Sequence, residues 1–436
     1  MVSSSFSDIS EVIKEKRIGD DVEIRGWLAG LRSSGGIQFF RIRDGTGFIQ
    51  CTLKKDVVGE DQFLEIERLP LESTLALSGV VREDKRAPKG IEISIKQVRI
   101  MSRAEEGYPI AKKYHGPDFL LDNRHLWIRE EKMQVLFRIR AAFLEAARRW
   151  FKENDYIEVQ VPTLITAACE GGSTLFEVKY FDQKVYLTQS WQLYAEAMIA
   201  SVGRIYTIAP SFRAESSRTR RHLTEYWHLE VEALWADLED IMKVQEELLS
   251  YICHTLAEEN SEDLRYLGRD PHDLLMVKPP FPKLTYREVV NHLRKKDVGV
   301  KYGEDLAWEQ ESVLAAEREI PFFVTGYPKS AKAFYHKIDP RNSDLTLSTD
   351  LLAPEGYGEI TGGGQRVDSL KELLSRIKEN GLRTEDYQWY VDLRRFGAVP
   401  HSGFGLGIER TLAWICKLKH IRDAIAFPRL INRVYP

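Results

Sequence analysis

The sequence contains few cysteines and no long apolar segment. Its four cysteines stand far apart and form no CxxC pair, which argues against a disulfide framework or a zinc ribbon. The longest stretch without Asp, Glu, Lys or Arg is 396–408. Because a membrane-spanning helix needs about 20 apolar residues, we expect no membrane segment. No apolar signal-peptide core is present in the starting segment MVSSSFSDISEVIKEKR, so we expect a cytoplasmic protein.

The sequence also lacks an excess of either charge. The formal net charge is −4, so binding to nucleic acid would need local basic patches rather than a basic surface overall. Hydrophobic residues make up 43% and charged residues 29%, which is ordinary for a globular protein and excludes disorder as the main state. At about 150 residues per domain, the 436 residues predict two to three domains.

Residues 20–102 predict a small all-β domain. Five short runs are rich in strand-forming residues, and Gly35-Gly36, Asp44-Gly45 and Lys89-Gly90 mark turns between them. Five strands in a segment of this length fit a closed barrel, of which the oligonucleotide-binding OB fold is the commonest design. Another small β barrel or sandwich fits the same spacing. We expect this domain to cover residues 1–102.

The rest of the chain predicts an α+β domain. Residues 103–130 are expected to form a linker, and the helical spacing of apolar residues predicts a helix over 131–153. Strand patterns follow without a helix after each strand, which favours an antiparallel sheet flanked by helices. We expect this domain to cover residues 131–436, with a mixed helical insertion at about 259–345 and a further strand at 391–395.

A cluster of charged residues lies within the segment 205–235. Arg213 and Glu215 are two residues apart in a predicted strand and therefore point to one face. The next strand alternates apolar residues with a polar face made of Tyr226, His228, Glu230 and Glu232. The loop between the strands is basic and suits a polyphosphate or an RNA end; it contains Arg218, Arg220, Arg221 and His222. The alternative is a charged hairpin exposed to solvent. Charged residues on the inner faces of both paired strands favour a functional site instead.

Two glycine-rich segments carry further candidates. Glu359 lies between glycines in the segment 355–366, where a backbone can approach a ligand closely and a carboxylate suits Mg²⁺. Arg366 would be available for an anionic or polar substrate group, although a flexible loop is the alternative. In the segment 401–414, three alternating glycines precede Glu409 and Arg410. A P-loop motif is absent, and the dinucleotide-binding GxGxxG pattern fits poorly.

Together these segments resemble the class II aminoacyl-tRNA synthetases, in the group of the aspartyl, asparaginyl and lysyl enzymes. The helix and strand of 131–164 are similar to motif 1, FRAE…RHLTEYWHLEVE to motif 2, and GFGLGIER to motif 3. The motifs occur in the family's order, and the barrel stands where the family keeps its anticodon-binding OB domain. The resemblance covers nearly the whole chain, and it implies ATP as a substrate, Mg²⁺, tRNA as a partner and a homodimer.

The resemblance implies roles for single residues in the nucleotide site. Arg213, Glu359 and Arg410 would be catalytic, because charge develops on the α-phosphate as the amino acid carboxylate attacks it. No nucleophile from the protein is needed. Glu359 and Glu232 would hold the Mg²⁺. The nucleotide contacts that the resemblance implies are Arg213, Ala214, Glu215, Arg221, His222, Leu223, Tyr226, Glu359, Gly407, Ile408, Glu409 and Arg410.

The amino acid that we expect is asparagine. In the aspartyl enzymes the segment QSPQLYK carries a lysine for the substrate carboxylate, whereas QSWQLYAE here has Ala195 at that position. An aspartate side chain would lose its cationic partner in a dry pocket. The NH₂ group of asparagine would find an acceptor in Glu196 or Glu230. The amino-acid contacts that the resemblance implies are Glu170, Gln189, Gln192, Glu196, Arg213, Glu230, Gly362 and Arg366.

The barrel would read the tRNA anticodon. Single-stranded bases are recognised by stacking and by hydrogen bonds to their edges. The resemblance implies that Arg25, Phe39, Gln50 and Glu92 contact the anticodon. One of the adjacent Phe39 and Phe40 is expected in the barrel core, since neighbours in a strand point to opposite faces.

Other functions fit the same residues. An aspartyl enzyme, including one that accepts two tRNAs, is the alternative within the family. A paralogue that makes a free amide or only binds RNA is the alternative outside it. Tests with asparagine, aspartate and tRNA distinguish these cases.

Overall fold

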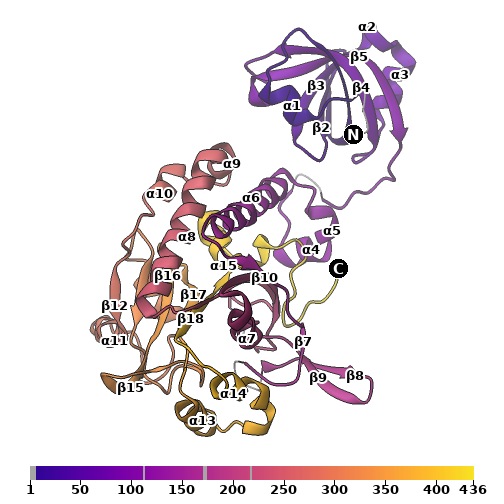
Figure 1. The fold of residues 1–436 in the computed structure, drawn as a ribbon. Coiled ribbons are helices and arrows are strands. Elements are labelled where there is room, and N and C mark those ends of the chain that lie inside the picture. The colour runs from indigo at the N-terminus through magenta and orange to yellow at the C-terminus, as the bar shows by residue number, and fades with distance from the viewer. Residues whose placement is uncertain (1–5, 111–112, 170–173, 217–218) are drawn as a thin grey trace. The chain divides into compact units, whose positions relative to one another are not determined.

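Five strands in the N-terminal part of the chain close into a barrel (Figure 1). The computed structural model describes residues 6–110, 113–169, 174–216 and 219–436. The chain divides into one unit of residues 1–134 and another of residues 135–435. In the described residues, no helix is both long enough and apolar enough to cross a membrane.

The barrel has the strand order β1-β2-β3-β5-β4, and β4 pairs with β1 to close it. All pairs are antiparallel except the parallel pair of β3 and β5. The strand bounds are β1 (Asp21–Ser34), β2 (Ile37–Arg43), β3 (Phe48–Lys54), β4 (Thr74–Glu83) and β5 (Ile91–Ser102). The prediction of a small closed barrel of five strands is therefore confirmed.

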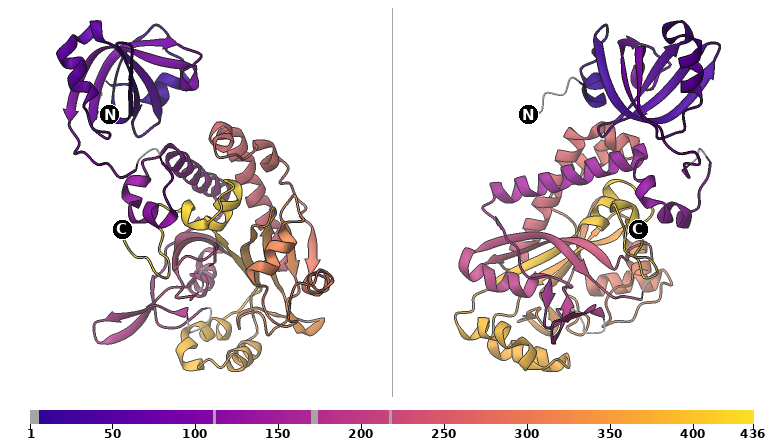
Figure 2. Two further views of the ribbon diagram at one scale, coloured as in Figure 1. Left: turned by 180° about the vertical axis from the view of Figure 1, so that it is seen from behind. Right: turned by 90° about the vertical axis from the view of Figure 1, so that its right-hand side faces the viewer.

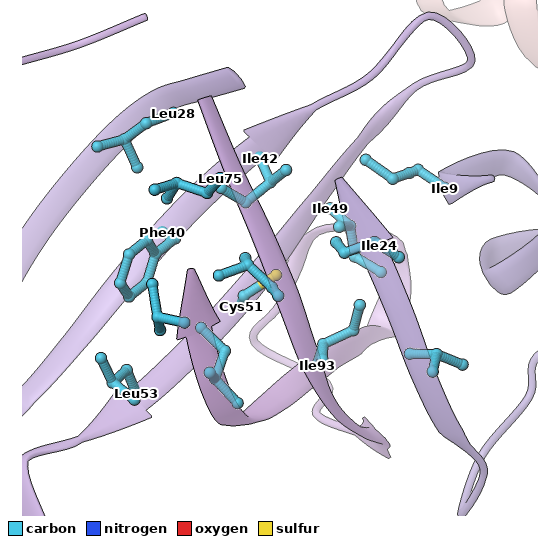
Figure 3. Close-up of a cluster of buried hydrophobic side chains, with 14 of the residues drawn as sticks. Ile9, Ile24, Leu28, Phe40, Ile42, Ile49, Cys51, Leu53, Leu75 and Ile93 are labelled. Carbon is cyan, nitrogen blue, oxygen red and sulfur yellow. The ribbon is translucent and has the colours of Figure 1, made fainter. Parts of the chain in front are cut away.

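Strand alternation builds the barrel core. Phe40, Ile42, Ile49 and Cys51 are almost completely buried and point into the barrel (Figure 3). The amphipathic helix α1 (Ile9–Lys14) adds its two buried residues to the same core. All four cysteines of the chain are buried thiols. Between β3 and β4 lie α2 (Lys55–Val58) and α3 (Glu60–Glu67), and η1 (Pro88–Gly90) precedes β5.

The segment expected as a linker contains short helices. Within 103–130 the chain forms α4 (Pro117–Asp122) and α5 (Arg124–Trp127). Arg124 is buried, with its guanidinium 4.4 Å from the ring centroid of Trp127. The part of this segment next to the long helix is thus ordered by packing that its polar composition did not reveal.

The second unit is built on one eight-stranded sheet, with the order β12-β13-β16-β17-β18-β11-β10-β6 (Figure 1). The pairs from β13 to β10 are antiparallel, and the pair at each edge is parallel. The prediction of an α+β domain with an antiparallel sheet is confirmed. The strand bounds are β6 (Ile157–Glu158), β10 (Arg204–Phe212), β11 (Glu225–Leu234), β12 (Lys283–Thr285), β13 (Phe322–Thr325), β16 (Ser348–Ala353), β17 (Gly358–Gln365) and β18 (His401–Gly407).

Helices cover this sheet. The predicted helix over 131–153 is α6 (Glu131–Glu153), which runs beside α8 (Leu238–Glu259) and is joined to it by Arg149 and Glu259, 3.0 Å apart (Figure 2). A capping box of Asp237 and Asp240 starts α8. On β17, Thr361 donates a hydrogen bond to Gln245 of α8, so the neighbouring residues of β17 face the other side of the sheet. Other helices of this unit include α7 (Gln192–Val202), α14 (Gln388–Arg395) and α15 (Ile408–Ile415).

Two sequence predictions for this unit were wrong. The segment 259–345 is not only a helical insertion, because its strands β12 and β13 form one edge of the main sheet. The segment 391–395 belongs to helix α14, where Tyr390 and Val391 are buried. The other elements are β7 (Leu164–Ile165), β8 (Glu177–Tyr180), β9 (Gln183–Leu187), α9 (Ser261–Tyr266), α10 (Pro271–Leu275), α11 (Tyr286–Lys295), α12 (Trp308–Ala315), β14 (Ile338–Asp339), β15 (Asn342–Thr346), α13 (Leu370–Glu379), η3 (Thr384–Tyr387) and η4 (Ile421–Ala424).

Candidate active site

A cavity of about 430 Å³ lies over the middle of the eight-stranded sheet. Its floor follows one row of paired residues across four strands: Glu230 on β11, Gly405 on β18, Gly362 on β17 and Asp350 on β16. The two central residues have no side chains, so ligand atoms can approach the strands closely between the two acids. The glycine-rich segments are thus strands of the sheet, and the alternative of a flexible surface loop is excluded.

Most predicted site residues come together in this cavity. The lining includes Gln192, Arg213, Glu215, Arg221, His222, Leu223, Tyr226, Glu230, Glu232, Glu359, Gly362, Arg366, Gly407, Glu409 and Arg410. Four predicted residues are not part of the lining: Gln189, Glu196, Ala214 and Ile408. Glu170 and Arg218 lie outside the described residues.

Arginines gather at one end of the cavity. Arg410 contacts the Glu359 carboxylate at 2.7 Å, and Arg221 donates to the Glu359 carbonyl oxygen at 2.5 Å and to the buried Glu311. The guanidinium of Arg213 lies 5.7 Å from the ring centroid of Tyr226. Burial favours a neutral carboxyl, but the surrounding arginines outweigh it and lower the pKa of Glu359 to about 2. This end of the cavity therefore keeps fixed cations beside an ionised carboxylate and an aromatic ring.

A short network orders the loop residues of the second predicted motif. His222 lies 3.2 Å from Glu215 and 2.5 Å from the hydroxyl of Thr219. Burial, together with nearby positive charge, lowers the pKa of His222 below its usual range. His222 and Glu215 thus hold each other at the rim where Arg213 also lies.

Asp350 is a further acidic residue of the cavity, and none of the sequence motifs indicated it. Its carboxylate and that of Glu359 meet at Gly362: a Cβ there would lie 3.4 Å from Oδ1 of Asp350 and 3.3 Å from Oε1 of Glu359. Lys332 contacts Asp350 at 2.8 Å. Burial, aided by the negative charges of Asp305 and Glu359, raises the pKa of Asp350 to about 7 against the opposing effect of Lys332. An aspartate within the apolar strand STDLLA was the signal that could have found it.

Arg366 and Glu232 form a buried ion pair at the other end of the cavity. Two nitrogens of Arg366 donate to Oε1 of Glu232, one of them at 2.9 Å. The carboxylate of Glu232, a metal ligand according to the resemblance, contacts Arg366, just as the other expected ligand, Glu359, contacts Arg410. The metal-binding role of Glu232 stays a prediction. Nearby, Glu230 accepts hydrogen bonds from the Ser190 hydroxyl at 2.5 Å and from the backbone of Trp191 at 2.7 Å.

Glu196 is not a direct contact in the cavity, contrary to the prediction. It is buried behind the lining, and its partners are Gln192, Tyr390, Arg394 and His401. Burial alone would raise the pKa of Glu196, but Arg394 and His401 hold it below its usual range. The sequence did not reveal these partners because most of them are far away along the chain.

Three other predicted residues have structural partners within the protein. Glu409 accepts a hydrogen bond from the backbone of Trp227 at 2.9 Å and contacts Arg140 of α6 at 2.7 Å, so it ties α15 to β11 and α6. Gln189 donates to the hydroxyl of Thr174 at 2.7 Å. Ala214 donates its N–H to the carbonyl oxygen of the same threonine at 2.8 Å.

Three of the four residues predicted on the barrel share one region of its outer surface. Gln50 on β3 pairs in register with Glu92 on β5 and donates to its carboxylate at 2.9 Å. Phe39 on β2 pairs with Thr52, which follows Gln50 by two residues on β3. The Phe39 ring is half-buried, and the guanidinium of Arg32 lies 4.9 Å from its centroid. Phe40 is the core residue of the pair.

Arg25 lies apart from these rows of the barrel. It is exposed on β1, opposite Ala76 of β4, and its guanidinium stands 4.6 Å from the ring centroid of Phe6. The structure thus brings three of the four predicted barrel residues together.

Comparison with known proteins gives a consistent result. A family model described as tRNA synthetases class II (D, K and N) matches residues 116–431, and one for an OB-fold nucleic acid binding domain matches residues 22–101. The chain is 48% identical over 421 residues to an asparagine–tRNA ligase of Desulforamulus reducens, covering 97% of this chain and 98% of that protein. The identity to an asparagine–tRNA ligase of Thermoplasma acidophilum is 46% over 428 residues, with coverages of 98% and 99%. The crystal structure of asparaginyl-tRNA synthetase from Pyrococcus horikoshii complexed with asparaginyl-adenylate matches with a TM-score of 0.95 and 45% identity, over 100% of both chains.

Proposed function

The chain belongs to the class II tRNA synthetases of the aspartate, lysine and asparagine group, and we propose that it attaches asparagine to tRNA, using ATP and an asparaginyl-adenylate intermediate. The observation that carries the choice of amino acid is the charge balance of the cavity. Arg366 is neutralised by Glu232, and Glu230 adds a further negative charge. A neutral carboxamide is compatible with this balance, whereas the carboxylate of aspartate would face the carboxylate of Glu230 beside an arginine that Glu232 already neutralises.

The first reaction joins asparagine to AMP. The asparagine carboxylate attacks the α-phosphorus of ATP, and pyrophosphate leaves. Arg213 and Arg410 line the same cavity, and the ionised Glu359 fixes the Arg410 guanidinium. Preorganised guanidinium groups stabilise the charge that develops on the phosphate in the transition state. Tyr226, beside Arg213, offers a ring face for the adenine.

The cavity also has carboxylates that fit Mg²⁺. This ion is bound in proteins through one or two carboxylates together with substrate phosphates. Glu359 and Asp350, which meet at Gly362, supply such a pair, and we assign the ion to them rather than to Glu232. No cluster of three or more His, Cys, Asp or Glu suited to a metal occurs in the described part of the chain, so phosphate oxygens would complete the coordination. Held by these carboxylates, the ion would neutralise negative charge on the phosphates.

The second reaction transfers the asparaginyl group to the 3′-OH of the tRNA. Recognition of the anticodon is assigned to the barrel, where the half-buried Phe39 offers an aromatic ring for stacking and Gln50 with Glu92 offers polar groups for hydrogen bonds. Arg25 would act from a separate part of the barrel. A homodimer formed through motif 1 and a cytoplasmic location complete the proposal.

Amino-acid-dependent exchange between ATP and pyrophosphate tests the choice of asparagine. We expect exchange with asparagine, and at least about 100-fold slower exchange with aspartate at equal concentration, because a polar site rejects the wrong side chain strongly. Exchange with aspartate alone would show an aspartyl enzyme. Absence of tRNA-dependent AMP formation would show a paralogue without tRNA charging.

A further inference from the structure

Glu196 on α7 is a buried carboxylate with partners on three different elements. Its Oε2 accepts from the Tyr390 hydroxyl at 2.7 Å and from Arg394 at 2.5 Å, both on α14, and lies 3.0 Å from Nε2 of His401 on β18. Its Oε1 accepts a hydrogen bond from Nε2 of Gln192 at 3.0 Å. The three groups at Oε2 fix the orientation of the carboxylate, and Oε1 is thereby held at Gln192.

This arrangement determines which way the Gln192 amide turns. A carboxylate only accepts hydrogen bonds, so the group facing Glu196 must be the NH₂ group of Gln192. Gln192 lines the active-site cavity, whereas Glu196 does not. The carbonyl oxygen is therefore the polar atom that Gln192 can offer to a ligand in the cavity.

We infer that Glu196 is a positioning residue: by holding the NH₂ group of Gln192, it presents the Gln192 carbonyl oxygen to an N–H donor of the bound amino acid. This inference rests on the proposed function, because it takes asparagine as the ligand. It replaces the expectation that Glu196 itself accepts from the substrate. Glu196 acts from behind the lining, and Gln192 makes the contact.

The variant Glu196→Gln tests this geometry because it changes almost no volume. Tyr390 and Arg394 donate hydrogen bonds, so the oxygen of the new amide would stay with them and its NH₂ group would face Gln192. Gln192 would then turn its own oxygen inward and its NH₂ group toward the cavity. The NH₂ group of Gln192 would then face an N–H donor of the bound asparagine. We therefore expect the KM for asparagine to rise at least about tenfold, while the KM for ATP stays within about twofold.

A double-mutant cycle separates positioning from a general structural role. The KM for asparagine is measured by ATP–pyrophosphate exchange in the wild type, Glu196→Gln, Gln192→Ala and the double variant. If Glu196 acts through Gln192, adding Glu196→Gln to Gln192→Ala raises the KM no further. Independent, multiplying effects would overturn the inference. Gln388→Ala is the control on the same helix, since the exposed Gln388 contacts Asp392 at 3.0 Å and not Glu196; its KM for asparagine should stay within about twofold.

A second variant keeps the test open if Glu196→Gln does not fold. Glu196→Asp keeps a carboxylate for Arg394 but withdraws it from Gln192, so the KM for asparagine should again rise. An unchanged KM in this variant would overturn the inference. Failure of the proposed function looks different: the wild type itself would then show no exchange with asparagine.

Discussion

Arg366 and Glu232 neutralise each other inside the active-site cavity, with side-chain exposures of only 3% and 2%. The pair is held by two hydrogen bonds from Arg366 to one carboxylate oxygen. The guanidinium can therefore orient a substrate amide by hydrogen bonding without presenting net positive charge. The discrimination between asparagine and aspartate therefore depends on the carboxylate of Glu232, which does not need to contact the substrate itself.

Removing that anion should weaken the selectivity for asparagine. In Glu232→Gln, Arg366 keeps its charge without a partner, so aspartate should be used better and the asparagine-to-aspartate ratio of kcat/KM should fall by at least about tenfold. Stability should also drop by about 3–5 kcal/mol, since a buried pair is broken. Glu311→Gln is the matched control: it breaks the buried pair with Arg221 and should raise the KM for ATP without changing the ratio. An unchanged ratio in Glu232→Gln would contradict the charge-balance argument.

Arg213 should affect the chemical step more strongly than amino acid binding. We expect Arg213→Ala to lower kcat of ATP–pyrophosphate exchange by about 100- to 1000-fold, because one preorganised donor to the developing charge is lost. The KM for asparagine should change little. Arg138→Ala provides the control, since Arg138 forms an exposed pair with Asp263 on the surface at 2.8 Å. A kcat loss of similar size in both variants would rule out a specific role for Arg213.

The magnesium requirement should depend on Asp350. Asp350→Asn removes one of the two carboxylates at Gly362, and the Mg²⁺ concentration for half-maximal exchange should rise by about tenfold or more. Asp305→Asn is the control, because Asp305 contacts the same Lys332 at 3.2 Å but is more exposed. If Glu232→Gln shifted the Mg²⁺ requirement and Asp350→Asn did not, the metal would have to be assigned to Glu232 again.

On the barrel, Phe39 and Phe40 should behave differently. Phe39→Ala should reduce tRNA charging by about 5- to 150-fold, the loss of one base stack, and leave adenylate formation unchanged. Phe40→Ala should destabilise the barrel by about 3–5 kcal/mol, since this ring is 1% exposed in the core. The measurements are aminoacylation, pyrophosphate exchange and thermal unfolding. Equal loss of both activities in Phe39→Ala would count against anticodon contact.

The stability of the folded protein should also depend on pH through the ionisation of Glu196. Its pKa is held below the usual range in the folded protein by Arg394 and His401 despite its burial, so it contributes stability above the pKa of the unfolded chain, about 4.3. This contribution is lost as the pH falls below that value. The difference in Tm between the wild type and Glu196→Gln should therefore shrink from pH 7 to pH 3. A difference that grows on acidification would refute the assignment of a depressed pKa.

Local patterns in the sequence predicted much of the fold. The helix over 131–153 follows directly from the spacing of its apolar residues, and the alternation around Phe39 and Phe40 follows from strand geometry. The edge strands β12 and β13 were missed because three or four residues in a charged region carry too little periodicity. The helix at 388–395 was missed because the short run VDLRR also fits a strand.

The site was predictable where its residues lie in compact motifs. Arg213, Tyr226, Glu359 and Arg410 all line the cavity. The ion pair of Glu232 was not predictable, because its partner is 134 residues away and only the sheet brings them together. The same holds for Glu196 and Arg394, which are 198 residues apart. Residue types indicated a site, but the pairing of charges needed the three-dimensional structure.

One glycine of the central sheet, Gly403, should tolerate no larger residue. A Cβ at Gly403 of β18 would lie only 2.2 Å from the carboxylate of Glu232 and 2.2 Å from the carbonyl oxygen of Val231. Even alanine would displace the anion that balances Arg366. In a saturation library selected for growth on this gene alone, position 403 should therefore accept no substitution, although Gly403 is not part of the cavity lining.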